Sequence, residues 1–92
     1  GRLILDAGAV SAIQERGVSL LPAGVTNVTG DFSSGDTVEI AGPEGIVIAR
    51  GLVAFDSEEI PQMLGRSTKD LAKELGPEYE RELVHRDDMV LL

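Results

Sequence analysis

The chain has no cysteine and no tryptophan, and its 92 residues include only one tyrosine, two phenylalanines and one histidine. Without cysteine neither a disulfide nor a thiolate metal site can form, and a reducing cytoplasm is the simpler expectation. A single histidine excludes a multi-histidine metal site within one chain. No run approaches the roughly 20 apolar residues that span a bilayer, and no basic-then-apolar leader is present, so we expect a soluble chain without a membrane partner.

Basic side chains are also scarce, since eight Lys and Arg stand against sixteen Asp and Glu and give a net charge of −8. Such a charge repels phosphate backbones and disfavours RNA as a partner, although screening over about 8 Å lets a local basic patch act alone. The hydrophobic content of 42% predicts one core of Val, Ile, Leu and Ala. We therefore expect a single domain over residues 1–92, and the start at Gly1 without Met is compatible with a fragment of a longer protein.

Phosphate-binding loops are missing, and so is a glycine-framed serine, so we predict no catalytic, cofactor-binding or metal-binding residue. The acidic pairs Asp87-Asp88 and Glu58-Glu59 are not preset to share an ion, because adjacent strand residues face opposite ways and adjacent helical residues diverge by about 100°. We interpret His85 as a half-buried strand residue hydrogen-bonded to a neighbour, with a pH-sensing or interface role as the alternative.

The chain is organised around two apolar β-prone pieces, Leu20–Val28 and Thr37–Ile40, which flank a Gly-Asp-Phe-Ser-Ser-Gly-Asp segment typical of a turn. This pattern predicts a strand, a turn and a strand. Pro22 has no N–H for a sheet, and Gly24 lets a backbone approach another surface. We therefore place Leu20–Gly24 at a sheet edge, a bend or an approach to a partner, with a barrel corner as the plainer alternative.

The N-terminal part predicts a strand followed by a helix. An apolar run at residues 2–5 favours the strand, and Asp6 can cap a helix over about residues 7–16 that Gly17 ends in a left-handed conformation. Arg16 in the last turn complements the helix dipole, and contact with a phosphate is the alternative.

The middle of the chain predicts further strands. After a turn at residues 42–45, the apolar stretch 45–55 is longer than a usual strand. We expect Gly51 to divide it into Ile46–Arg50 and Leu52–Phe55, because glycine permits the bulge by which a small sheet curls.

Two helices and a strand are expected in the last third. Asp56 and Glu59 have capping-box spacing and predict a helix that contains Pro61 and ends at Gly65. Ser67 can cap the next helix, whose buried stripe is Leu71, Ala72 and Leu75 and which stops at Gly76-Pro77. A charged connector at 78–82 then precedes a final strand, 83–92, that bulges or bends at its acidic centre.

Arg66, Lys69 and Lys73 form a candidate anion or RNA patch along this last helix. Asp70 and Glu74 are interleaved with them, and at these spacings the acids pair with the lysines. A solvated, salt-bridged face is therefore the favoured interpretation. Overall, the order of elements predicts a mainly β, α+β fold, a small closed or nearly closed pseudo-barrel of mostly antiparallel strands with two to three short helices.

Several short motifs, taken in order, resemble the PUA domain. Within that group the chain looks like the C-terminal PUA domain of bacterial glutamate 5-kinases. The motifs that carry the resemblance are Asp6-Ala7-Gly8-Ala9, Ser19-Leu20-Leu21-Pro22-Ala23-Gly24-Val25, Gly30-Asp31-Phe32, Gly35-Asp36-Thr37-Val38-Glu39-Ile40, Ile48-Ala49-Arg50-Gly51-Leu52 and His85-Arg86-Asp87-Asp88-Met89-Val90-Leu91-Leu92.

The resemblance implies a cytoplasmic, oligomeric parent enzyme that phosphorylates the γ-carboxylate of glutamate with ATP and Mg²⁺, the first step of proline synthesis. The N-terminal kinase domain is not in this chain, so no catalytic residue is carried over. The expected role is an accessory, regulatory domain whose partners are its own kinase domain and neighbouring subunits. The alternative is an RNA-binding module, and the residues implied by position to face RNA or a partner are Gly17, Ser19, Leu21, Ala23 and Gly24.

Overall fold

The computed structural model describes all of residues 1–92 and has five strands and two α-helices. The strands are β1 (Arg2–Leu5), β2 (Val25–Thr29), β3 (Thr37–Ala41), β4 (Val47–Leu52) and β5 (Met89–Leu91), and the helices are α1 (Ala7–Arg16) and α2 (Thr68–Leu75). Short 3-10 turns span Pro22–Gly24, Ile60–Met63, Pro77–Tyr79 and Arg86–Asp88. Neither α-helix has the length and apolar character that crossing a bilayer requires.

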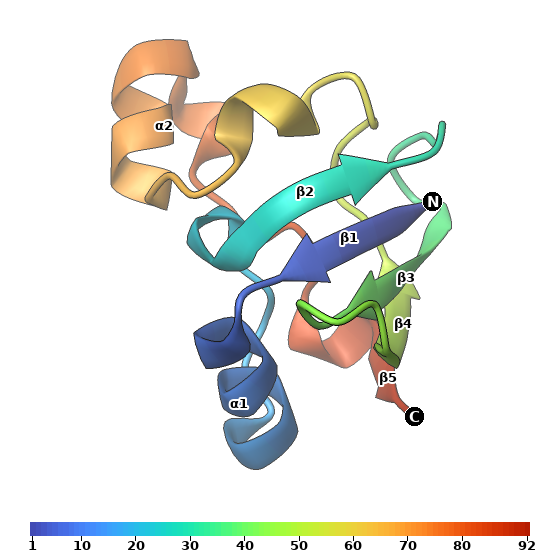
Figure 1. The fold of residues 1–92 in the computed structure, drawn as a ribbon. Helices are drawn as coiled ribbons and strands as arrows, with labels where there is room; N and C mark the ends of the chain where they lie inside the picture. Colours follow the sequence, from blue (N-terminus) through green and yellow to red (C-terminus); the bar gives the residue numbers. More distant parts are fainter.

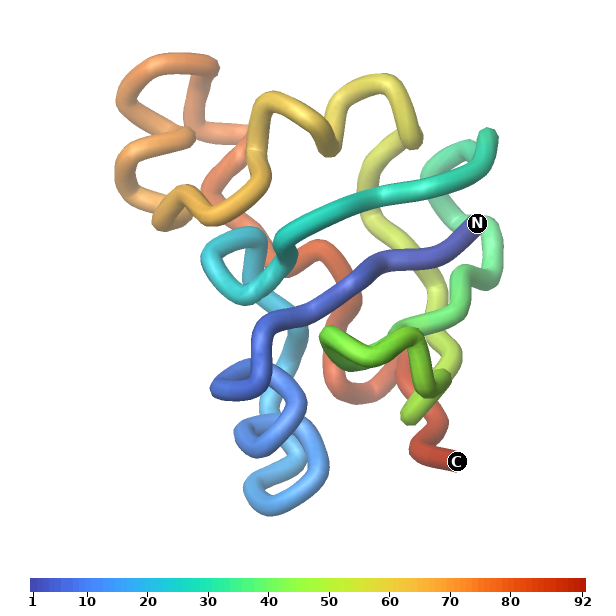
Figure 2. The backbone as a smooth tube through the Cα atoms, viewed as in Figure 1, coloured from blue at the N-terminus to red at the C-terminus, as the bar shows by residue number.

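The strands form one curved sheet in the order β2-β1-β3-β4-β5 (Figure 1). β1 pairs with β3 in parallel, and the other three pairs are antiparallel. The predicted mainly β, PUA-like fold is confirmed. A fully closed barrel is not formed, because β2 and β5 are the two edges of the sheet and do not pair with each other. The tube in Figure 2 shows α1 at the lower left of the sheet and the α2 region at its upper left.

The core lies on the inner face of the sheet and is entirely apolar. Alternate residues of the central strands are fully buried, among them Leu3, Leu5 and Ile40. The helices and turns close over them, and the contributing side chains include Ile13, Ile60, Met63, Leu71, Leu83 and Val84. No polar or charged residue is buried, so the core holds no group that would need a compensating partner.

Both α-helices begin and end where their caps predict. Asp6 Oδ1 accepts a hydrogen bond from the Ala9 N–H at 2.7 Å, and Gly17 ends α1 at a φ of 61°. Ser67 Oγ accepts from the Asp70 N–H at 3.2 Å at the start of α2. Caps satisfy N–H groups that have no partner within the helix, and this local requirement sets the helix starts.

Two of the expected strands have other bounds in the structure. Residues 22–24 form a 3-10 turn, so β2 begins at Val25. β2 and β3 are not neighbours in the sheet, since β1 lies between them. The final ten residues hold only a bridge at Val84, a 3-10 turn and the short β5, so the expected bend occupies much of that segment.

Gly51 does not divide β4, which runs unbroken from Val47 to Leu52. The expected second strand, Leu52–Phe55, is not formed, because residues 53–55 are outside any strand. A β-carbon at Gly51 would lie 2.5 Å from Val84 Cγ1 and 2.9 Å from the Asp88 carbonyl oxygen. The glycine therefore permits the close approach of the chain before β5, and the prediction of a bulge at this position is wrong.

The helix expected after Asp56 is a bent succession of turns with a 3-10 segment at Ile60–Met63. Half of the expected capping box is present, because Glu59 Oε2 accepts from the Asp56 N–H at 3.0 Å. The Asp56 carboxylate instead accepts from the N–H of Ser34, 22 residues earlier, at 2.8 Å. A long-range contact thus replaces the local one.

Candidate functional site

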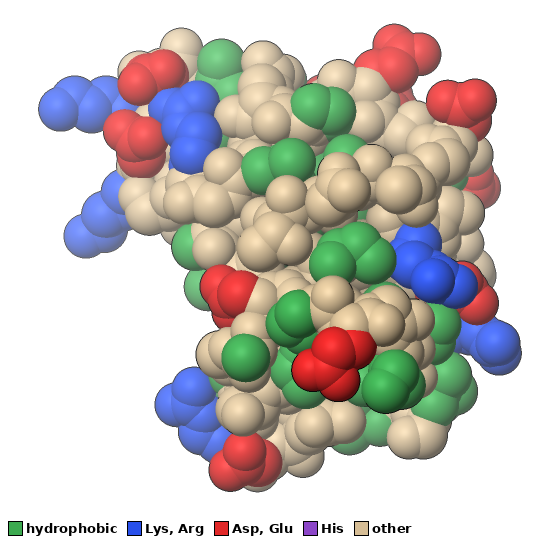
Figure 3. Space-filling model, in the orientation of Figure 1, with side chains coloured by type: hydrophobic (Ala, Val, Ile, Leu, Met, Phe, Trp, Pro, Cys, Tyr) green, Lys and Arg blue, Asp and Glu red, His purple; other side chains and the backbone are tan.

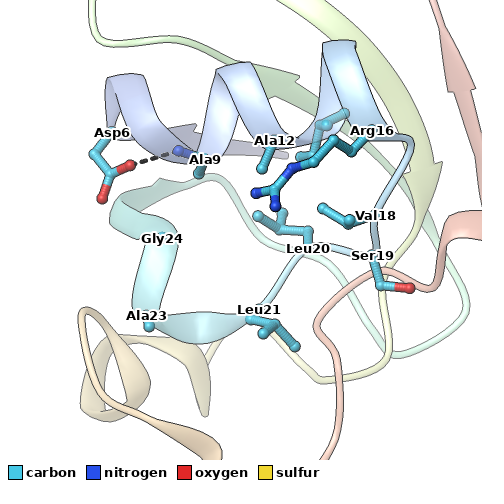
Figure 4. Close-up of a pocket in the computed structure, with 11 residues that line it drawn as sticks. Asp6, Ala9, Ala12, Arg16, Val18, Ser19, Leu20, Leu21, Ala23 and Gly24 are labelled. Atoms are coloured by element: carbon cyan, nitrogen blue, oxygen red, sulfur yellow. Dashed lines mark hydrogen bonds between the residues drawn. The ribbon is translucent and has the colours of Figure 1, made fainter.

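A groove runs between α1 and the segment that follows it, and it is the candidate functional site (Figure 4). One wall is α1. The other wall is the extended piece that begins at Val18 and the 3-10 turn that ends at Gly24. Leu20 anchors this wall, because its N–H donates to the Val84 carbonyl at 2.9 Å and its own carbonyl accepts from Leu83 at 2.8 Å.

The two walls meet at Gly24. The Asp6 N–H donates to the Gly24 carbonyl at 3.0 Å, and a β-carbon at Gly24 would lie 2.6 Å from the Ala9 β-carbon. Only a residue without a side chain fits here without displacing α1. The glycine that we expected to face a partner therefore also has a structural role, which is to join the helix to the turn.

The groove has a volume of about 520 Å³ and a mainly apolar lining. Its lining residues are Asp6, Ala9, Ala12, Ile13, Arg16, Val18, Ser19, Leu20, Leu21, Ala23 and Gly24. In Figure 4 the Arg16 guanidinium extends over the groove, above Leu20. Arg16 makes no ion pair and no side-chain hydrogen bond, so its charge is available to a ligand.

Four of the five residues that the resemblance placed toward RNA or a partner lie along this groove: Ser19, Leu21, Ala23 and Gly24. Ser19 Oγ accepts from the Arg86 N–H at 2.8 Å, and its side chain points away from the groove (Figure 4). Gly17 does not line the groove. It borders a smaller cavity of about 180 Å³ beside β5. A role in ligand contact remains a prediction for all five.

The groove also has lining residues that were not predicted to face a partner, and several of them lie on α1. Ala9 and Ala12 form the helical wall, and Arg16 supplies the only cation. The spacing of small residues on one helical face was the available signal, because positions three and four apart share a face. Helical spacing alone does not tell which face stays open, since that depends on where the later turn packs.

Of the three cations in the expected anion patch along α2, only Arg66 pairs with the neighbouring acids. Arg66 pairs with Asp70 at 3.0 Å and with Glu74 at 2.9 Å. These hydrogen bonds raise the pKa of Arg66 above its ordinary value. The salt-bridged face is present, but its cation is Arg66, whereas we expected Lys69 and Lys73 to pair with the acids.

His85 is half-exposed and lies just before the last 3-10 turn, not within a strand. Its Nδ1 accepts from the Asp87 N–H at 3.0 Å, so the hydrogen bond to a neighbour is local. The acids Asp87, Asp88, Glu58 and Glu59 do not gather, and no group of three or more His, Asp or Glu side chains is arranged to hold a metal ion.

The comparisons with known proteins agree with this architecture. Residues 1–75 match the model of the PUA domain family, and the chain therefore belongs to that family. A PUA domain structure from Aeropyrum pernix, solved as a tartrate complex, superposes with a TM-score of 0.68 at 25% identity over 94% of this chain and 41% of that one. A PUA domain protein from Thermoplasma acidophilum gives a TM-score of 0.60 at 24% identity, over 66% of this chain and 40% of that one, and supports the fold alone.

Sequence relatives are more specific. The chain is 66% identical over all 92 residues to a glutamate 5-kinase of Frankia casuarinae and 64% identical to one of Streptomyces avermitilis. It matches the C-terminal part of such enzymes and spans only 25% and 24% of their lengths. The chain is thus a PUA domain similar to the C-terminal quarter of glutamate 5-kinases.

Proposed function

We propose that this chain is the non-catalytic, C-terminal accessory domain of a glutamate 5-kinase and that it biases activity or assembly by packing against kinase domains. The observation that carries the proposal is 66% identity to such an enzyme across the whole chain. The parent reaction, transfer of the ATP γ-phosphoryl group to glutamate with Mg²⁺ in the cytoplasm, belongs to the preceding portion. The partners are that portion and neighbouring subunits of a homo-oligomer.

The groove supports a surface role over a catalytic one. It offers one guanidinium, Arg16, and one carboxylate, Asp6, which already caps α1. ATP with Mg²⁺ calls for several donors around its phosphates and oxygen ligands for the metal. This lining does not fit that group, so no step of phosphoryl transfer is assigned to residues of this chain.

The test compares the complete parent enzyme with the same enzyme cut at an engineered protease site before Gly1 and freed of the domain. Cleavage after folding avoids the misfolding that a truncated gene product risks. We expect kcat, the KM values, inhibition by proline or the oligomeric mass to change severalfold. Identical kinetics, feedback response and mass in the two preparations would contradict the proposal.

RNA binding is the second candidate, and the unpaired Arg16 over the groove is the observation that favours it. The net charge of −8 acts against it, since RNA affinity depends on displaced counterions. A gel-shift titration of the complete enzyme with a structured RNA hairpin at low salt tests this candidate. If RNA binds, Arg16→Ala should weaken binding and reduce the salt slope by roughly 0.7–0.9.

Arg66→Ala is the matched control, because Arg66 is already paired with its own acids. It should leave RNA binding unchanged. Absence of salt-dependent binding in the unmodified enzyme would exclude this candidate.

A further inference from the structure

The exposed apolar side chains of this chain fall into two groups. Val18 and Leu21 line the groove already described. The other five large ones lie on or beside β4 and β5, and they are Ile46, Leu52, Val90, Leu91 and Leu92, with exposed fractions between 44% and 67%. Figure 3 shows hydrophobic side chains at the lower right, where β4 begins and β5 leads to the C-terminus in Figure 1. A concentration of this kind is typical of a surface that contacts a partner.

These side chains continue a row that crosses the outer face of the sheet. The strand register places Arg2 beside Glu39, Glu39 beside Arg50, and Arg50 beside Val90. Because side chains alternate along a strand, Leu52 and Leu92 face the same way as Arg50 and Val90. We call Arg50, Leu52, Val90 and Leu92 the outer β4–β5 face.

Of the two arginines in this row, one makes an ion pair and the other does not. Arg2 Nη2 lies 2.8 Å from Glu39 Oε1, and this hydrogen bond lowers the pKa of Glu39. Arg50 makes no ion pair and no side-chain hydrogen bond. The outer β4–β5 face thus combines three exposed apolar side chains with one cation that makes no ion pair, on a domain whose net charge is −8.

We propose that the outer β4–β5 face is the surface on which the preceding domain of the longer chain docks. This inference rests on the proposed function. Relatives are about four times as long as this chain and match it at their C-terminal part, so the remainder of such an enzyme joins at Gly1. That remainder is the domain that we infer to dock on the outer β4–β5 face.

The position of Gly1 allows the preceding domain to reach this face. Its carbonyl accepts from the Glu39 N–H at 2.9 Å, which holds the start of the chain against β3. β1 and β5 are three strand spacings apart, about 14 Å, so roughly four extended residues span the distance from Arg2 to Val90. The docking domain should present apolar side chains and a carboxylate, the latter opposite Arg50.

The test uses the complete enzyme with the double substitution Leu52→Asp and Val90→Asp. Both changes place an acid opposite the carboxylate that we expect on the docking domain. Charges that are buried without a partner also weaken an interface. We expect the unmodified enzyme to unfold in one cooperative thermal transition and the double variant to unfold in two. We also expect protease cleavage at the junction before Gly1 to accelerate at least about tenfold.

Leu21→Asp is the matched control, since Leu21 is 48% exposed and Leu52 is 44% exposed. It should change neither the thermal transition nor the junction cleavage. Should the double variant lose the transition of the domain itself, Leu52→Ala with Val90→Ala decides the outcome by the same measurements, with a smaller expected acceleration of severalfold.

Three results would overturn the inference. The double variants could leave cooperativity and cleavage unchanged, or Leu21→Asp alone could separate the transitions, which would place docking at the groove. If the double variant had half the oligomeric mass of the unmodified enzyme but the junction before Gly1 stayed resistant to protease, the face would make contacts between copies of the enzyme. The comparison of the complete enzyme with the enzyme freed of this domain does not use these variants. If that comparison shows an effect and the variants show none, the accessory role stands and only the docking surface is wrong.

Discussion

Gly24 and Ala9 lie in such close contact that a β-carbon on Gly24 would be 2.6 Å from the β-carbon of Ala9. The contact holds the 3-10 turn against α1 and sets one end of the groove. The Asp6 N–H to Gly24 carbonyl bond at 3.0 Å reinforces the same junction. The shape of the candidate site therefore depends on a position that carries no side chain.

Gly24→Ala should destabilise the domain, because α1 or the turn must move to admit the methyl group. Overpacking of this kind costs about 1–3 kcal/mol. Urea unfolding followed by circular dichroism measures the change. Gly8→Ala is the control: its β-carbon meets only Asp6 Oδ1 at 3.4 Å within a helix, where alanine is favoured. An equal loss in both variants would contradict the importance of the Gly24 contact.

Gly51→Ala should be at least as damaging, since one of its close neighbours is backbone. Its new methyl group would meet Val84 Cγ1 at 2.5 Å and the Asp88 carbonyl oxygen at 2.9 Å. We expect a loss of about 1–3 kcal/mol or more and faster amide exchange in β5. Unchanged stability would show that β5 is not held closely against β4.

Removal of either helix cap should cost about 0.5–2 kcal/mol. Asp6→Ala deletes the acceptor of the Ala9 N–H, and Ser67→Ala deletes the acceptor of the Asp70 N–H. Hydrogen exchange at these two amides, compared between the variants, locates each effect in its own helix. Loss of protection at both amides in either single variant would contradict independent capping.

The Arg2–Glu39 pair predicts a pH dependence of stability. The hydrogen bond from Arg2 lowers the pKa of Glu39 below its ordinary value of 4.5. The contribution is therefore complete above pH 4.5 and is lost as the pH falls through the lower, folded-state pKa. Glu39→Gln should remove this component, so the stability difference between the unmodified domain and the variant should shrink on acidification. Because both side chains are partly exposed, added salt should reduce the difference at neutral pH.

Much of the candidate site could be predicted from residues close together in the sequence. Ser19, Leu21, Ala23 and Gly24 follow one another within a single segment, and the resemblance to PUA domains placed them on one surface. Arg16 could not be assigned to the groove in the same way. Its relation to Leu21 depends on how the segment after Gly17 folds back along α1, and the anchor for that path is Val84, 64 residues from Leu20.

The amino-acid sequence alone determined the local features: the caps at Asp6 and Ser67, the left-handed stop at Gly17 and the absence of catalytic motifs. The caps and the helix stop depend on contacts between residues three or four apart, which each segment can form by itself. Tertiary structure decided that β1 separates β2 from β3, that Gly51 admits β5, and that Arg2 meets Glu39, 37 residues away. Such contacts form only when distant strands share one core, so no local pattern encodes them.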